Sequence, residues 1–478
     1  MSAIRFRVEH LLYVLAALAC CTADLLILDG VQTGMLAVTP ALKATTWVSL
    51  ICLVITLCLW IRRVGGIGFF LFYLLSFYFF TMGQGVLMSL GLEYSFTNVY
   101  DFVTPEVMLD AHVFTLFSFV LLAEGGFLAA GYGDINSQST KSSEDEVALK
   151  SAMYRVGLVT FYLSLPAMLL WMVSLLTAFA AGGYTYAFES VSNSSGLFRI
   201  CAKVYPLFTP SLVMLYLSSD GRRRQAAKLG LFLVSFLYFS IGERTGGASI
   251  ALVALFMEII VEGKSRVRLA LLIAFLLVFI PILGVLRGSM DMSVGAVTSA
   301  VAADGLFSHV TETIATLGYS VFPLGMTMEI VPGQKDFAYG ESYFFALLSI
   351  FPNILGGTHI SVTHAGLAQW LMDYLNMTYG PGFSYPAEAW YNFGWSGFWV
   401  HGVIGFLFAR CMSLTHGQKH TILQIFIAAA FFMLTITSPR RDFMTVVRMC
   451  SYYVFIPYFF IIYVQRRTYL NILKNKIR

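Results

Sequence analysis

Long runs of apolar residues, separated by short polar and basic segments, dominate the hydropathy pattern of this chain. About twelve runs are long enough to cross the ~30 Å hydrocarbon core of a bilayer as helices. The pattern therefore predicts an all-α polytopic membrane protein with about twelve transmembrane helices. The predicted spans lie near 11–28, 45–61, 67–90, 107–130, 156–180, 200–217, 229–241, 248–261, 269–286, 394–409, 422–437 and 444–463.

Residues 287–393 interrupt this series of spans. In this segment short apolar runs alternate with Gly and Pro, and none is long enough to cross a membrane. The runs at 344–351 and 364–375 predict short helices, the second with Thr363 as its N-cap. A long ordered loop in a membrane protein is where substrate binding and chemistry are expected.

The chain is expected to fall into five parts. A Ser-rich segment of mixed charge separates the first spans from the rest and predicts a flexible linker. The parts are a front transmembrane bundle (1–131), a cytoplasmic linker (132–155), central transmembrane helices (156–286), a large periplasmic loop (287–393), and C-terminal transmembrane helices with a basic tail (394–478).

Composition agrees with the membrane class and excludes several functions. Charged residues make up 12% of the chain and hydrophobic residues 58%, whereas soluble domains carry about 25% charged residues. The chain has no Cys/His spacing typical of zinc sites, no Asp-x-Asp and no phosphate-binding glycine loop. We therefore predict no metal, no cofactor and no nucleic-acid partner.

The distribution of Lys and Arg predicts the orientation of the chain in the membrane. With the spans above, the basic clusters fall on alternate loops, which identifies the cytoplasmic side. Both termini are then cytoplasmic, and the loop 287–393 is extracytoplasmic. The clusters are Arg5/Arg7, Arg62/Arg63, Lys141/Lys150/Arg155, Arg222/Arg223/Arg224/Lys228, Lys264/Arg266/Arg268, Arg410/Lys419 and Arg466/Arg467, with Lys474, Lys476 and Arg478 at the end.

A second set of arginines lies near the predicted outer ends of spans, against this bias: Arg244, Arg287, Arg440, Arg441 and Arg448. Ionised groups at such depth are costly and indicate an anionic partner. The planar donors of Arg fit phosphate oxygens, so a polyprenyl diphosphate at the headgroup level is one candidate. The alternative is that the arginines pair with Glu243, Asp291 and Asp442 and fix helix ends.

Two residues of the large loop are candidate bases for deprotonating a hydroxyl group, Glu388 and His364. His359 and His309 are weaker candidates. Around Glu388 lie the aromatic residues Tyr385, Trp390, Tyr391 and Trp395. Aromatic rings stack on sugars, but they also form belts at membrane interfaces. In that alternative, Glu388 would only cap a helix and His364 would have a structural role.

The string GFSYPAEAWYNFGWSG, residues 382–397, resembles a motif of bacterial O-antigen polysaccharide polymerases of the Wzy type. The motif positions are occupied by Ser384, Glu388, Tyr391, Asn392, Phe393 and Gly394. The order of features is also similar, with Arg244 on a Gly-flanked turn, a long outer loop late in the chain, and closing spans that carry an outer arginine pair.

The resemblance implies a metal-independent glycosyltransferase of GT-C-like architecture in the bacterial inner membrane. Such enzymes transfer a growing glycan from undecaprenyl diphosphate to a new lipid-linked repeat unit, with a chain-length-determinant co-polymerase as partner. Carried onto this chain, Arg244, Arg440 and Arg441 would hold the diphosphate, and the residue chemistry adds Arg287. Glycan contacts are expected from Ser384, Tyr385, Tyr391 and Asn392. The base, His364 or Glu388, is a hypothesis from the chemistry of the residues and not from the resemblance.

Two other functions use similar features. An O-antigen ligase transfers the same donor to a lipid A core sugar, with outer arginines and a loop histidine, and the segment from Glu388 to Asn392 favours a polymerase over it. A lipid-linked oligosaccharide flippase of about twelve spans would be expected to have two similar halves and short outer loops. The chain shows no internal repeat and has one long loop, which disfavours a transporter.

Overall fold

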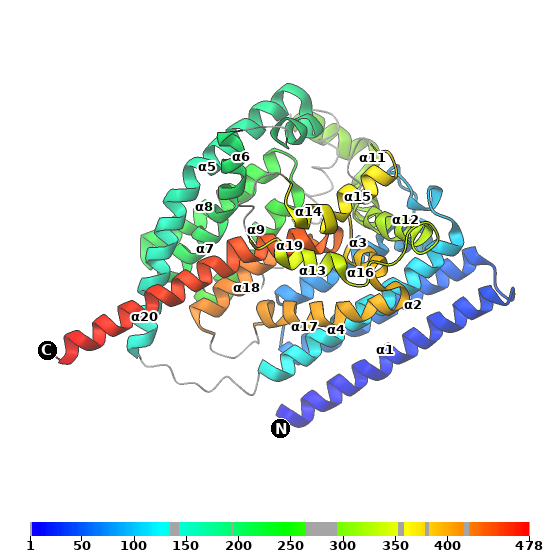
Figure 1. Ribbon diagram of the computed structural model, residues 1–478, viewed down its shortest axis with the longest axis horizontal. Helices are drawn as coiled ribbons and strands as arrows, with labels where there is room; N and C mark the ends of the chain where they lie inside the picture. Colours follow the sequence, from blue (N-terminus) through cyan, green and yellow to red (C-terminus); the bar gives the residue numbers. More distant parts are fainter. Residues whose placement is uncertain are drawn as a thin grey trace. The chain divides into compact units, whose positions relative to one another are not determined.

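The computed structural model describes residues 2–133, 143–192, 196–263, 267, 294–351, 358–377, 382–414 and 420–477. Regular structure within these ranges is helical throughout, without strands (Figure 1). The chain forms two compact units. Unit 1 consists of Met1–Gln138, Ile314–Gln418 and Leu434–Met449, and unit 2 of Ser139–Thr313, Lys419–Met433 and Cys450–Arg478.

Helices that are long and apolar enough to cross a membrane confirm the prediction of an all-α polytopic membrane protein. Within the described ranges they are Val8–Gln32, Val38–Val64, Phe69–Leu90, Pro105–Gly131, Glu144–Gly182, Ile200–Ser218, Arg244–Glu262, Ile422–Arg440 and Phe443–Lys474. The predicted span 229–241 is covered up to Ser240 by the longer helix α8 (Gly221–Ser240). The span 394–409 is divided between a 3₁₀ turn, η4 (Gly394–Phe398), and helix α17 (Trp399–Met412). The predicted span 269–286 lies outside the described residues.

Unit 1 contains four long helices and a group of short ones. The long helices are α1 (Ser2–Gln32), α2 (Val38–Val64), α3 (Phe69–Leu90) and α4 (Pro105–Gly133). The shorter elements are η1 (Val99–Asp101), η3 (Tyr319–Val321), α12 (Phe322–Ile330), α13 (Glu341–Leu348), α14 (Ile360–Ala365), α15 (Leu367–Tyr374), α16 (Tyr385–Phe393), η4 (Gly394–Phe398), α17 (Trp399–Met412), η5 (Ser438–Arg440) and α19 (Phe443–Cys450).

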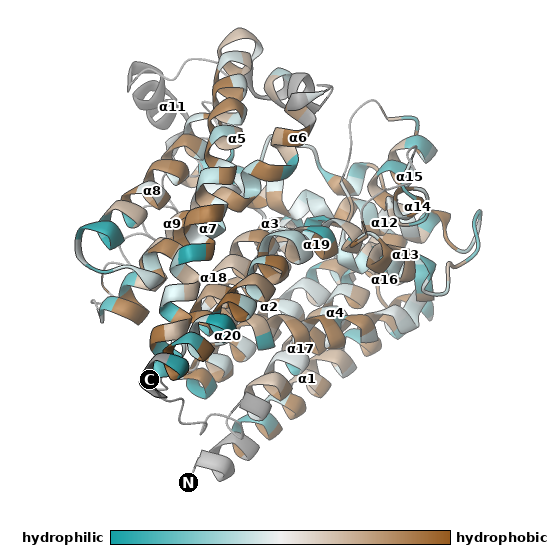
Figure 2. Ribbon diagram, turned by 60° about the vertical axis from the view of Figure 1, so that its left-hand side comes forward, coloured by the Kyte–Doolittle hydropathy of each residue, from teal (hydrophilic) through white to brown (hydrophobic). Residues whose placement is uncertain are grey.

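Glycines let α4 and α17 cross at very short distance. A Cβ atom at Gly405 would lie 1.9 Å from the carbonyl oxygen of Leu122, and one at Gly125 would lie 2.1 Å from that of Gly402. Small residues allow backbones to approach in this way, and the packing contacts then stabilise helices that gain little from the hydrophobic effect in lipid. In Figure 2 both helices are coloured mainly as hydrophobic.

An apolar core joins α4, α12 and α16 within unit 1. The ring of Phe114 on α4 meets Trp390 on α16 edge to face, with centroids 5.5 Å apart. The indole Nε1–H of Trp390 donates to the carbonyl oxygen of Val331, just after α12, at 2.9 Å. Because a buried indole N–H needs a partner, this bond and the ring contact together fix the position of α16 against the long helices.

Unit 2 contains α5 (Ser143–Ser192), α6 (Leu197–Val204), η2 (Tyr205–Leu207), α7 (Phe208–Ser218), α8 (Gly221–Ser240), α9 (Arg244–Glu262), the π-helical turn η6 (Ser451–Phe455) and α20 (Ile456–Ile477). Helices α11 (Val294–Gly318) and α18 (Ile422–Thr435) contribute residues to both units. The predicted linker 132–155 overlaps the first turns of α5, where acidic residues at 144–146 favour a helix N-terminus. Residues 134–142 lie outside the described ranges.

The described part of the segment 287–393 is largely helical, from α11 to α16. The predicted helix 364–375 is two helices, because the chain turns at Gly366 between α14 and α15. The N-cap also differs from the prediction: His359 caps α14, and its Nδ1 accepts from the Ser361 amide at 3.1 Å. The break at Gly366 allows His364 and Trp370 to approach one cavity from different helices.

Candidate functional site

The local sequence explains where helix α16 begins and ends. The Ser384 hydroxyl caps its N-terminus by accepting from the Ala387 amide at 3.4 Å, and Pro386 occupies a first-turn position. The helix ends before Gly394, whose φ of 56° lies in the left-handed region. Ser384, Glu388 and Asn392 are spaced four residues apart and therefore share one face of the helix.

The Glu388 carboxyl group lies inside this unit, with no exposed surface. Its Oε1 accepts from the Ser342 hydroxyl at 2.7 Å, and its Oε2 accepts from the Phe443 amide at 2.6 Å. Burial raises the pKa of Glu388 from 4.5 to about 8, with a further raising effect from Asp442, although these two hydrogen bonds act in the opposite direction. Glu388 thus joins α16 to the starts of α13 and α19.

Asn392 extends this contact to the turn before α13. Its Nδ2 donates to the Ser342 hydroxyl and to the Glu388 carbonyl, both at 2.8 Å, and its Oδ1 accepts from the Gly340 amide at 3.0 Å. The amides of Ala338 and Tyr339 donate to the carbonyls of residues 391 and 392. The turn 338–342 is therefore fixed to α16 by both backbone and side chains.

A histidine and a glutamate meet beside this turn. His364 Nδ1 and Glu341 Oε1 are 2.5 Å apart, and the imidazole stacks on the Phe345 ring with centroids 4.2 Å apart. The His364 side chain is 37% exposed and that of Glu341 is 47% exposed, so both remain accessible to a ligand. The contact with Glu341 restricts rotation of the imidazole about its own axis, and the stacking on Phe345 restricts tilting of the ring plane.

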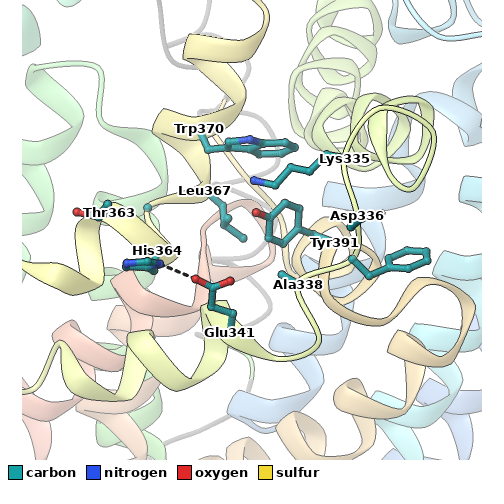
Figure 3. A pocket seen from close by; sticks show the side chains of 11 residues that line it. Lys335, Asp336, Ala338, Glu341, Thr363, His364, Leu367, Trp370 and Tyr391 are labelled. Atoms are coloured by element: carbon teal, nitrogen blue, oxygen red, sulfur yellow. Dashed lines mark hydrogen bonds and ion pairs between the residues drawn. The ribbon is translucent and has the colours of Figure 1, made fainter.

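Both residues line a cavity of about 360 Å³. Figure 3 shows Glu341 projecting between His364 and Tyr391, with the Lys335 ammonium between two aromatic rings. The Lys335 Nζ lies 5.0 Å from the Trp370 ring centre and 4.9 Å from that of Tyr391. The lining residues are Lys335, Asp336, Phe337, Ala338, Glu341, Thr363, His364, Gly366, Leu367, Trp370 and Tyr391.

The outer arginine pair precedes α19 in the same unit. Arg440 is exposed, with its guanidinium 5.9 Å from the Phe80 ring centre, and Arg441 is half-buried. Asp442 is the buried N-cap of α19, accepting from the Thr445 amide at 3.0 Å. Burial raises the pKa of Asp442, although Thr445 and the arginines at 441 and 448 act to lower it. The arginine pair is thus anchored on both sides, by η5 and by the capped start of α19.

Comparison with known proteins identifies the family. The sequence model of the O-antigen polysaccharide polymerase Wzy family matches residues 26–471, which is nearly the whole chain. The chain belongs to this family. No curated protein and no solved structure matches the chain.

Membership in the Wzy family confirms the resemblance inferred from residues 382–397. The protein is an O-antigen polymerase, a multi-pass membrane enzyme that joins lipid-linked oligosaccharide repeat units by glycosyl transfer. The family assignment does not say which residues bind or react, so the site rests on the geometry above.

The structure separates the residues that the sequence predicted for glycan binding and for the base. Tyr391 lines the cavity, whereas Ser384, Tyr385, Glu388 and Asn392 are almost completely buried, each at most 1% exposed. Three of the four predicted glycan contacts are therefore buried and do not line this cavity. His364 is the predicted candidate base that does reach the cavity.

The remaining predicted arginines are in other parts of the chain. Arg244 is the first residue of α9 in unit 2, beside the N-cap Glu243, which accepts from the Gly246 amide at 3.3 Å. Arg287 lies outside the described residues. Their role at the diphosphate stays a prediction.

Sequence reasoning missed four residues of this region: Lys335, Glu341, Ser342 and Trp370. Only Trp370 carried a usable signal, as a large aromatic residue in a loop already expected to bind a glycan. Glu341 and Ser342 belong to no motif, and they matter because folding brings them to His364 and Glu388, 23 and 46 residues further along the chain.

Proposed function

We propose that this Wzy-family protein polymerises undecaprenyl-diphosphate-linked oligosaccharide repeat units at the outer face of the bacterial inner membrane, without a metal ion. The observation that carries the proposal is the cavity in which the rings of Trp370 and Tyr391 and the His364–Glu341 pair meet. Aromatic side chains with a few convergent polar groups are typical of ligand sites. Here they suit a sugar whose hydroxyl group is to be activated.

In the proposed step, His364 acts as general base on a hydroxyl of the acceptor sugar. The hydroxyl oxygen forms a bond to the anomeric carbon of the growing glycan. The bond from that carbon to the diphosphate breaks, and undecaprenyl diphosphate leaves with the electron pair. His364 takes the hydroxyl proton, so charge and atoms balance. Glu388 is the alternative base, and the variants His364→Gln and Glu388→Gln distinguish the two.

The leaving diphosphate needs stabilisation of its growing negative charge. Arg440 and Arg441 lie in the same unit as the cavity and offer planar donors suited to phosphate oxygens. Arg244 and Arg287 are the further arginines assigned to this group by the proposal. Fixed cations of this kind could replace a metal as the source of positive charge.

We expect Arg440→Lys and Arg441→Lys each to shorten the polymer and lower the elongation rate by about tenfold or more, because Lys keeps the charge but loses the bidentate fork. Chain length is measured on lipopolysaccharide gels and the rate with purified protein. Arg466→Lys, at an exposed position of α20, is the matched control. Wild-type length in both variants would return the pair to a structural role.

Elongation is expected to continue at an unchanged rate after exhaustive treatment with a chelator. The described residues include no group of three or more His, Cys, Asp or Glu side chains arranged to hold a metal ion. Purified protein is incubated with lipid-linked repeat units in EDTA, and product length is compared with a sample supplied with Mg²⁺ or Mn²⁺. A rate that depends on either ion contradicts the metal-free proposal.

The proposed location follows from the basic residues on alternate loops, which place both termini in the cytoplasm and the cavity outside. Cysteine labelling from outside tests it, with Thr358→Cys as the reporter, since Thr358 is exposed beside His359. Selective labelling of intact spheroplasts supports the orientation. Labelling only after the membrane is permeabilised contradicts it.

Two experiments test the activity itself. A strain without the gene should carry lipopolysaccharide with a single repeat unit, whereas loss of a ligase would leave no repeat units on the lipid A core. Purified protein should lengthen lipid-linked repeat units in detergent, which a flippase would not do.

We assign the modal length to a chain-length-determinant co-polymerase, so purified polymerase alone should give a broad length distribution.

A further inference from the structure

We propose that Glu341 is a positioning residue for the base His364, and that the buried Glu388–Ser342–Asn392 network holds Glu341 in place. The inference rests on the proposed role of His364 and adds a residue that the Wzy motif does not contain. It also gives the buried motif residues a function that needs no contact with the substrate.

The imidazole has one nitrogen committed to Glu341. With Glu341 ionised, the 2.5 Å contact is a hydrogen bond donated by His364 Nδ1–H to Oε1. The unprotonated nitrogen is then Nε2, to which no described residue donates a hydrogen bond. A carboxylate that fixes the tautomer in this way also stabilises the imidazolium that forms once the proton has been taken. Phe345 holds the ring plane by stacking.

Glu341 is held through both of its neighbours in the chain, by the backbone amide of Gly340 and by the side chain of Ser342. The amide of the preceding Gly340 donates to Asn392 Oδ1 at 3.0 Å. The hydroxyl of the following Ser342 donates to Glu388 Oε1 at 2.7 Å and accepts from Asn392 Nδ2 at 2.8 Å. The Glu341 amide itself donates to the Ala338 carbonyl at 2.9 Å. An exposed glutamate would otherwise lose side-chain and backbone entropy on pairing with His364.

The network is buried although the pair that it supports is accessible. Ser342, Glu388 and Asn392 each have no exposed surface. Buried polar groups of this kind are costly unless every group has a partner. Here the partners lie on α16, at the start of α13 with the preceding Gly340, and at Phe443 of α19. The free-energy cost of burying these polar groups is explained if the network serves to fix the position of Glu341. Rigid support of this type is what a base within hydrogen-bond reach of its substrate requires.

A double-mutant cycle on elongation tests the inference. Glu341→Gln keeps the size of the side chain and removes its charge, and His364→Gln removes the base. We expect Glu341→Gln to lower kcat by at least about tenfold with an unchanged KM for the acceptor lipid. The double variant should be no slower than His364→Gln alone, because Glu341 acts through the imidazole. Ser342→Ala should lower kcat in the same way, by a smaller factor.

Each outcome bears on a separate claim. Multiplicative losses in the double variant, or a raised KM with unchanged kcat, would overturn the positioning role of Glu341. A larger loss in Glu341→Gln than in His364→Gln would make Glu341 itself the base and also overturn it. Unchanged elongation in His364→Gln refutes the proposed base instead, and no elongation by the wild-type protein refutes the proposed function. Thermal unfolding in detergent identifies variants that have merely lost their fold, and Glu341→Asp should recover part of the rate.

Discussion

Replacing His364 by Gln is expected to slow elongation by about a hundredfold to ten-thousandfold, which is the usual contribution of a general base. Gln fills a similar volume and can still donate a hydrogen bond to Glu341, so the cavity wall should remain intact. What is lost is a nitrogen that can accept the hydroxyl proton. The rate is measured with purified protein, saturating donor lipid and a short acceptor repeat unit.

The matched control for this variant is His420→Gln, which makes the same chemical change in unit 2, outside the cavity. Donor-lipid binding should be equal in both variants and in the wild-type protein, since the diphosphate is assigned to arginines. Near-normal elongation by His364→Gln, with binding intact, would remove His364 from the mechanism. The aromatic cavity would then need another base.

The second large effect is expected at Glu388, where Gln and Ala should behave very differently. Glu388→Ala leaves the buried Phe443 amide without its acceptor, which costs about 1–3 kcal/mol, and adds a cavity in the core. Glu388→Gln can accept from Phe443 through its amide oxygen and donate to Ser342 through its nitrogen. We therefore expect Ala to abolish folding or activity and Gln to retain elongation. If Glu388 is the base, Gln should abolish elongation while donor binding stays intact.

Stability should also depend on pH through Glu388. Burial raises its folded pKa from 4.5 to about 8, so between these values the folded protein keeps a proton that the unfolded chain has lost. The contribution of this proton to the free energy of unfolding is complete below pH 4.5. It decreases as pH rises toward 8, by at most about 1.4 kcal/mol per pH unit. Asp442, whose pKa is also raised, contributes with the same sign.

Melting temperatures in detergent between pH 6 and 9 measure this dependence. Glu388→Gln should flatten the curve, because an amide does not titrate in this range. Glu106→Gln is the control, since Glu106 is exposed at the start of α4. An equal slope in wild-type and Glu388→Gln protein would assign the pH dependence to other groups.

Much of the fold could be predicted because it depends on local and compositional signals. The long apolar helices follow from hydropathy. The short helix α16 was not predicted, although Ser384 at its start and Gly394 at its end are residues that commonly bound helices. The broken helix at Gly366 was harder, because the residues on both sides have helical spacing. At this turn the Gly366 amide donates to the Val362 carbonyl at 3.2 Å. The start of α14 is capped by His359, and a histidine N-cap has no strong sequence signature.

The site was less predictable because its contacts join residues far apart in the chain. Sequence reasoning identified His364 and Glu388 as chemical candidates, but it could not tell that one faces a cavity and the other faces the core. The orientation of α16 depends on its packing against α4 and α12, through contacts such as Phe114 with Trp390. The same packing turns Tyr391 toward the cavity and Tyr385 away from it.

The glycine crossing of α4 and α17 makes distance from the cavity a poor guide to mutational tolerance. One methyl group at Gly405 has no room beside Leu122, so the helices must separate. Only η4 lies between α17 and α16 in the chain, and a displaced α17 therefore moves the helix that carries Glu388. A loss of activity on substituting Gly405 would then result from displacement of α17 and α16, although it would resemble the loss of a reacting group.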